Sequence, residues 1–290
     1  IRNKEYNRMR KVSSVSAGIL TGVLILGAAG CDKLRSRDDI NKGIAAFRSA
    51  KYGDAVEKFK EAAALDPTNG NATLYLATAY MSQWIPGADS PENLNFASMA
   101  QQEFNKVLEK NPVDTIALAS MASISFNQAG PLPPDQKIAK LDEAAKWDKR
   151  LIDADPKNKE AYYTLGGPIV WAKWYPALMT AKAGLHMKAE DPGPIKDKKV
   201  KDELKEKYLP MVDEGIANLQ KALDIDKEYD DAMAYMNLLI RERADLVDNP
   251  DEYKKQIEIA DLWVQRNLDT KKLKAARTPA TGGIVQDAPK

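Results

Sequence analysis

The sequence predicts an all-α protein built from a recurring helical hairpin. A spaced pattern of small and aromatic residues within 43–67 returns, in degraded form, at three later places in the sequence. Its apolar positions lie three and four residues apart, which is the spacing of one helix face, and no strand is predicted. Recurrence of this kind indicates a stack of similar hairpins rather than one globular core.

The first hairpin shows the pattern most clearly. Residues 39–50 and 54–65 predict two helices joined by a short turn. Gly43 is small enough for the two helices to approach closely, and Phe59 can fill the space beside it. Pro67 ends the second helix, because the residue before a proline is pushed out of helical geometry.

The later hairpins repeat the spacing of the first hairpin. The places equivalent to Gly43 hold small residues: Ala77, Ala122 and Gly166. The predicted first helices of these hairpins and of the last one cover 72–82, 114–127, 159–174 and 230–247. Pro168 predicts a kink or break in the third of these helices. Asp148 departs from the pattern, since a large apolar residue is expected at its place.

The pattern Ala-x-x-x-Phe-x-x-Ala-x-x-x-x-Pro of residues 55–67 resembles the tetratricopeptide repeat. The resemblance covers residues 32–270 and implies a right-handed superhelical solenoid of about five helical hairpins. A plain repeat of this family has about 34 residues, so the excess length is expected in loops and insertions.

The largest insertion falls near 172–208, in the fourth hairpin. It predicts a short helix over 177–188 and a separate, highly charged helix over 196–208. Beyond the last hairpin, residues 271–290 lack periodicity and predict a disordered tail.

The N-terminal segment, 1–31, predicts a signal peptide or a membrane anchor. Met9-Arg10-Lys11 is followed by the mostly apolar run Val12–Gly30 and then by Cys31, the single cysteine of the sequence. This arrangement resembles a bacterial lipoprotein signal, whose cysteine is acylated and becomes the first residue of the mature protein. The resemblance implies a membrane-anchored lipoprotein of the bacterial cell envelope that faces the periplasm or the cell exterior. An uncleaved anchor helix is the alternative.

Composition argues against several classes of function. The sequence has 43 Lys and Arg against 42 Asp and Glu, so it offers no strongly basic face for nucleic acid. His186 is the single histidine, which leaves too few ligands for a zinc site and little basis for a Ser-His-Asp arrangement. We therefore expect no enzyme activity, no metal and no cofactor.

The resemblance implies that the first helix of each hairpin lines a concave face that holds extended or helical peptides. Carried over position by position, the candidate partner-binding residues are Phe47, Arg48, Met81, Phe126, Asn127, Trp171 and Arg241. The expected function is a non-enzymatic protein–protein interaction scaffold or adaptor, whose partners are other envelope proteins or peptides. The alternative for the apolar members is that insertions cover them.

The sequence leaves two other functions open. Trp171, Trp174 and Tyr175 share one broad helix face, which predicts either a packing seam or an exposed aromatic platform for a partner or a sugar ring. The platform would suit a carbohydrate-binding envelope protein. Self-association through the open ends of the stack would instead make the protein a structural subunit of an array or filament.

Overall fold

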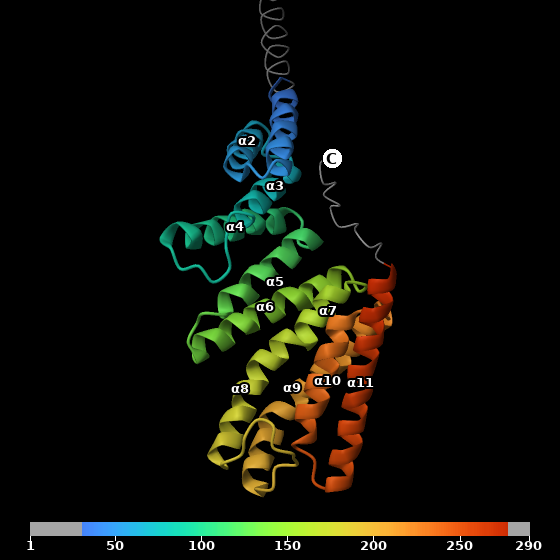
Figure 1. Ribbon diagram of the computed structural model, residues 1–290. Coiled ribbons are helices and arrows are strands. Elements are labelled where there is room, and N and C mark those ends of the chain that lie inside the picture. The colour runs from blue at the N-terminus through green and yellow to red at the C-terminus, as the bar shows by residue number, and fades with distance from the viewer. Residues whose placement is uncertain (1–30, 278–290) are drawn as a thin grey trace, which may run out of the picture. The chain divides into compact units, whose positions relative to one another are not determined.

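The computed structural model describes residues 31–277, in which all regular secondary structure is helical (Figure 1). The predicted signal or anchor over 1–30 lies outside the described residues, as does 278–290. The described residues form two compact units, which meet at Asn127 and Gln128, and each is described by itself. No described helix is both long and apolar enough to cross a membrane.

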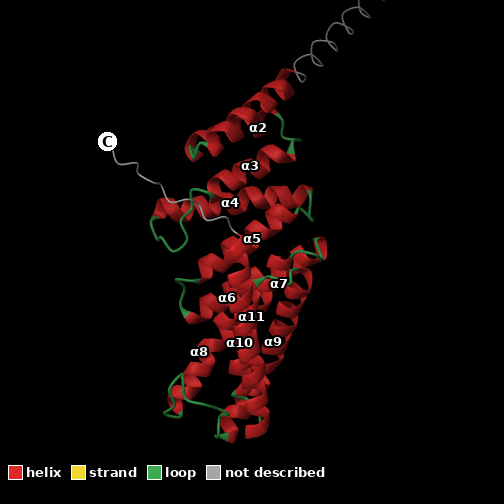
Figure 2. Ribbon diagram, turned by 45° about the vertical axis from the view of Figure 1, so that its right-hand side comes forward, coloured by secondary structure: helices red, strands yellow, loops and turns green. Residues whose placement is uncertain are grey.

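The first unit consists of helices joined by short turns. A helix covers 31–48 and is followed by α2 (Tyr52–Leu65), α3 (Gly70–Met81), α4 (Pro91–Lys110) and most of α5 (Thr115–Ala129). Neighbouring helices pair as hairpins, with α2 against α3 and α3 against α4 (Figure 2). The all-α, tetratricopeptide-like fold predicted from the sequence is confirmed.

Small residues set the spacing within the first hairpin, as the sequence pattern predicted. A Cβ atom on Gly43 would lie 2.5 Å from the ring of Phe59, so only glycine allows that ring to pack there. Ala55 and Ala62 are completely buried on the facing side of α2. The same arrangement of alanine and phenylalanine returns in α4, where Ala100 and Phe104 are completely buried.

The second unit continues the same architecture with longer helices. Its elements are α6 (Pro134–Ala154), α7 (Lys159–Gly166), α8 (Pro168–Gly184), α9 (Lys198–Ile225), α10 (Asp230–Ala244) and α11 (Pro250–Arg277). The break predicted at Pro168 is present, because α7 ends at Gly166 and α8 begins at the proline. Within the first unit the helix over 31–48 is followed by α2 and α3 by α4, and within the second unit α7 and α8 are followed by α9 and α10 by α11, so each unit holds two successive hairpins.

The insertion near 172–208 does not form separate helices, and this part of the sequence prediction is wrong. The segment instead lengthens α8 to Gly184 and brings the start of α9 forward to Lys198. Pro176 and Pro210 lie inside these helices without ending them. The extension is stable because its apolar residues join the core of the unit: Trp174, Leu178, Ile195 and Leu204 are buried.

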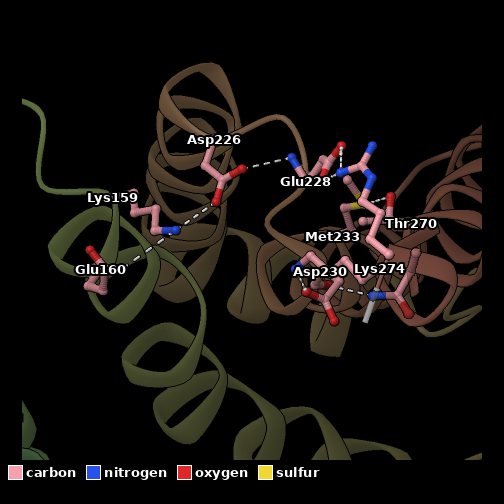
Figure 3. Close-up of polar contacts among 10 residues, drawn as sticks. Lys159, Glu160, Asp226, Glu228, Asp230, Met233, Thr270 and Lys274 are labelled. Atoms are coloured by element: carbon pink, nitrogen blue, oxygen red, sulfur yellow. Dashed lines mark hydrogen bonds and ion pairs between the residues drawn. The ribbon is translucent and has the colours of Figure 1, made fainter. Parts of the chain in front are cut away.

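Residues 271–277, which the sequence analysis placed in a disordered tail, are helical in the structure. Helix α11 continues through residues 271–277, because its last turns are tied to the turn between α9 and α10. Lys274 pairs with Asp230, as Figure 3 shows, and a guanidinium nitrogen of Arg277 lies 2.6 Å from Glu228. These contacts between helices keep residues 271–277 helical, although the sequence there has no periodic apolar residues.

The same turn is also joined to α7. The Lys159 ammonium lies 2.6 Å from the Asp226 carboxylate, which also accepts a hydrogen bond from the backbone N–H of Glu228 at 2.9 Å (Figure 3). The Asp226 pKa is held below its ordinary value, chiefly by the hydrogen bond from Lys159. Three helices of the second unit therefore converge on one polar turn.

Candidate binding groove

A cavity of about 460 Å³ opens in the first unit, at the C-terminal end of the helix over 31–48. This helix, α2, α3 and α5 all contribute to its walls. The lining residues are Ile44, Phe47, Arg48, Phe59, Leu74, Tyr75, Thr78 and Ile116. The volume lies within the range of about 300–1,000 Å³ that small ligand sites occupy, which is room for a few peptide side chains. We call this cavity the N-terminal groove.

Aromatic contacts fix the walls of the N-terminal groove. The ring centroids of Phe59 and Tyr75 are 5.5 Å apart, and those of Phe47 and Tyr52 are 5.1 Å apart in an edge-to-face arrangement. The Thr78 hydroxyl donates to the carbonyl of Leu74 within α3, so it is not aimed at a ligand. The groove is therefore a preformed and mostly apolar surface.

Arg48 is the one charged residue among those that line the groove. Its side chain is exposed, and no carboxylate of residues 31–277 pairs with it. A guanidinium offers several N–H donors in a planar fork that matches a carboxylate. The arrangement suits a ligand that brings an acidic group beside an apolar side chain.

The structure brings together only part of the predicted partner-binding set. Phe47 and Arg48 lie in the N-terminal groove. Met81, Phe126 and Asn127 are half-buried and do not line it, and the Asn127 amide donates to the carbonyl of Ser123 at 2.8 Å. The prediction missed four other residues of the first unit that line the groove: Phe59, Leu74, Tyr75 and Ile116.

The signal for Tyr75 was present in the sequence. Tyr75 lies three residues before Thr78, on the same face of the predicted helix. Ile116, an exposed apolar residue in the first turn of α5, carried no such signal in the sequence. Its contribution depends on how α5 approaches the earlier helices, which no local pattern reports.

In the second unit, the predicted partner-binding residues are engaged with other residues of the same unit. The Trp171 indole N–H donates to Glu242 at 3.0 Å, and its ring stacks on Tyr175 with centroids 4.7 Å apart. Arg241 on α10 pairs with Asp261 on α11 and with Asn237 on its own helix. These contacts connect helices within the unit.

Of the two alternatives for Trp171, Trp174 and Tyr175, Trp174 fits the packing seam and not the exposed platform. The Trp174 side chain is completely buried, and its ring lies 5.4 Å from that of Tyr208 on α9. Trp171 and Tyr175 are half-buried. Because α8 and α9 are long, they meet along this face and enclose the central ring between them.

Burial raises the pKa of three carboxyl groups in the second unit, those of Asp148, Glu242 and Asp245. The Asp148 pKa rises to about 8, and one of its oxygens has no hydrogen-bond partner. The Glu242 pKa rises to about 7, an effect that the hydrogen bond from Trp171 partly opposes. Among residues 31–277, no cluster of histidine, cysteine and acidic side chains is arranged to hold a metal ion.

No family model matches the sequence, and no curated protein matches it either. Solved structures do resemble it. A crystal structure of MamA protein superposes with a TM-score of 0.51 at 16% identity, over 85% of this chain and 97% of that one. A double mutant, MamA RS-1 ArsTM, gives a TM-score of 0.52 at 16% identity, over 83% and 97% of the two chains. MamA from Desulfovibrio magneticus RS-1 gives 0.50 at 15% identity, over 84% and 97%. At these identities the likeness shows the fold alone, a stack of tetratricopeptide-like helical hairpins.

Proposed function

We propose that this protein is a non-enzymatic adaptor that holds a segment of another bacterial envelope protein in the N-terminal groove. The observation that carries the proposal is the Arg48 guanidinium at the edge of an otherwise apolar cavity, where no carboxylate of residues 31–277 pairs with it. Stacked helical hairpins present extended surfaces of this kind to partner proteins. The fold alone does not name a function, so the argument rests on the groove.

The groove defines the chemistry of its ligand. Phe47 and Tyr75 offer aromatic surface for one or two apolar side chains, and the buried Phe59 ring lies behind them. Arg48 requires a carboxylate beside them, supplied by Asp, by Glu or by the C-terminus of the partner. The proposed ligand is therefore an extended peptide with a large apolar residue next to an acidic group.

The adaptor is further proposed to be tethered to a membrane through an acylated Cys31. Cys31 is exposed at the start of the described residues, where a lipid would not disturb the packing of the first hairpin. Several acyl groups on one residue would anchor the protein far more firmly than a single one. The groove would then face partners in the same envelope compartment.

A selection from a displayed library of random peptides tests the ligand chemistry. The full-length protein in detergent micelles is expected to enrich peptides with an apolar residue next to Asp or Glu. Arg48→Glu reverses the charge in the groove, so the enriched peptides should carry Lys or Arg in place of the acidic residue. Lys51→Glu makes the same charge change three residues away, on an exposed residue outside the lining, and should leave the selection unchanged.

Two results would contradict the proposed groove. One is enrichment that does not respond to Arg48→Glu, which would place binding elsewhere on the protein. The other is the absence of any enrichment by the folded wild-type protein. Circular dichroism of each variant separates loss of binding from loss of folding.

A further inference from the structure

Helix α11 carries a continuous exposed stripe that no other element among the described residues shields from solvent. Its members, which we call the α11 stripe, are Glu258, Leu262, Arg266, Asp269, Leu273 and Arg277. Successive members are three or four residues apart, so they share one face of the helix. All six are exposed, including Leu262 at 60% and Leu273 at 53%.

The side of α11 next to the stripe packs on its own unit. Ala260, Asn267 and Thr270 are its buried residues, and α11 lies along α10 in both views (Figures 1 and 2). The α11 stripe runs along the edge of this buried face rather than within it. At about 1.5 Å per residue, it spans roughly 28 Å, or about five helical turns.

When the stripe is read from its other end, the leucines keep their places and the acidic and basic residues are exchanged. It can therefore pair with an antiparallel copy of itself. An antiparallel copy centred between Asn267 and Leu268 places Glu258 opposite Arg277 and Leu262 opposite Leu273. The same alignment places Arg266 opposite Asp269. Every acidic member thus meets a basic one, and every leucine meets a leucine. A two-fold axis then generates each of these contacts twice.

The charged members at the centre of the stripe are available for such pairing. The Arg266 guanidinium lies over the Trp263 ring. The Asp269 carboxylate accepts a hydrogen bond from Gln265 at 2.9 Å and lies 3.9 Å from Lys272, and both of these contacts are exposed ones within α11. Arg277 already contacts Glu228, so its contact with a second copy would be shared.

A groove beside the stripe offers further contact area. It has a volume of about 380 Å³ and is formed by α11 together with α9 and α10. Trp263, Leu273 and Leu223 supply its apolar surface, while Arg266 and Asp269 belong to both the groove and the stripe. Side chains that flank the stripe of a second copy can enter it.

We propose that α11 binds a second copy of this protein through the α11 stripe, in an antiparallel arrangement with two-fold symmetry. The contact is isologous, so it closes as a dimer and does not propagate into a filament. Only four leucines and a few flanking residues lose exposure, so the dimer is expected to be weak and dependent on concentration. This inference does not depend on the N-terminal groove.

Charge reversal at the centre of the stripe tests the pairing. Sedimentation equilibrium of the full-length protein in density-matched detergent measures the dimer dissociation constant. Arg266→Asp places two acidic groups opposite each other at both symmetric positions, and Asp269→Arg places two basic groups there. Each single variant should weaken the dimer by about tenfold or more. Lys254→Asp, an exposed substitution on the same helix outside the stripe, is the matched control.

A mixture of the two single variants is the most discriminating test of the charge pairing. In the mixed pair Asp meets Arg at both positions, so the heterodimer should recover the wild-type affinity, while each variant alone keeps its weakened affinity. The double variant Arg266→Asp/Asp269→Arg should recover it too. A wild-type protein that stays monomeric would overturn the proposal. So would a dimer or larger assembly that is unaffected by these reversals, or a mixture that fails to recover.

Discussion

The Lys182 ammonium lies 2.8 Å from the Asp245 carboxylate, and both side chains are almost completely buried. This ion pair joins α8 to the residue that follows α10. The same ammonium donates to the carbonyls of Ala189 and Asp191, and the Asp245 carbonyl accepts from the N–H of Ile195 at 2.8 Å. The pair therefore fixes the loop between α8 and α9 to the core of the second unit.

Lys182→Met should strongly destabilise the second unit, because it leaves the Asp245 carboxyl buried without its partner. Breaking a buried pair in this way costs about 3–5 kcal/mol. Urea unfolding followed by tryptophan fluorescence measures the effect. Four of the five tryptophans belong to the second unit: Trp147, Trp171, Trp174 and Trp263.

Lys198→Met is the matched control for this experiment. Lys198 pairs with Asp202 one turn away on the surface of α9, and such exposed pairs contribute less than about 1 kcal/mol. The double variant Lys182→Met/Asp245→Asn should recover part of the lost stability, since it removes the buried charge. Equal costs for Lys182→Met and Lys198→Met would show that burial of the pair is not important.

The buried Asp148 carboxyl predicts a dependence of stability on pH. Its pKa is about 8 in the folded protein and about 3.8 in the unfolded state, so folding favours the protonated form. Its contribution to stability is complete below pH 3.8 and is lost as the pH rises toward 8. Asp148→Leu should therefore stabilise the second unit at about pH 8 by a few kcal/mol, because it also supplies the apolar residue expected there.

The difference between the wild type and Asp148→Leu isolates this group from the other carboxylates. That difference should shrink steadily from about pH 8 to about pH 5 in the urea measurement. Asp153→Leu changes an exposed residue on the same helix and should show no such trend. A constant difference across this range would mean that Asp148 does not titrate there.

The close approach of α7 and α9 at Gly166 and Gly215 predicts that a larger residue there destabilises the second unit. A Cβ atom on Gly166 would lie 2.6 Å from the carbonyl oxygen of Gly215, on the facing helix α9. Gly166→Ala should force α7 and α9 apart and cost about 1–3 kcal/mol in the same unfolding measurement. Gly184→Ala meets no atom within 4 Å, so it should be neutral or slightly stabilising. Similar effects at the two glycines would contradict the close approach.

Acylation of Cys31 predicts a defined mass and location for the mature protein. When the protein is expressed in a bacterium, mass spectrometry of the membrane fraction should find an N-terminal peptide that begins at Cys31 and carries acyl groups. Cys31→Ala should abolish both the acylation and the cleavage at this residue. Recovery of uncleaved residues 12–30 in the wild-type protein would support an anchor helix instead.

The sequence alone determined the local structure of this protein. Apolar spacing, small residues and prolines located most helices to within a few residues, and Pro168 marked the break between α7 and α8. These features were predictable because helix periodicity and proline geometry act over a few neighbouring residues. The resemblance to the tetratricopeptide repeat, carried over position by position, pointed to Phe47 and Arg48, which line the N-terminal groove.

The tertiary structure decided what depends on contacts between distant segments. It enclosed Trp174 between α8 and α9, extended α11 to Arg277 through ion pairs with the turn before α10, and added Ile116 to the groove. The spacing of residues along a helix shows only which of them lie on the same side. Whether another helix covers that side depends on the length and approach of segments many residues away, and burial follows from that packing.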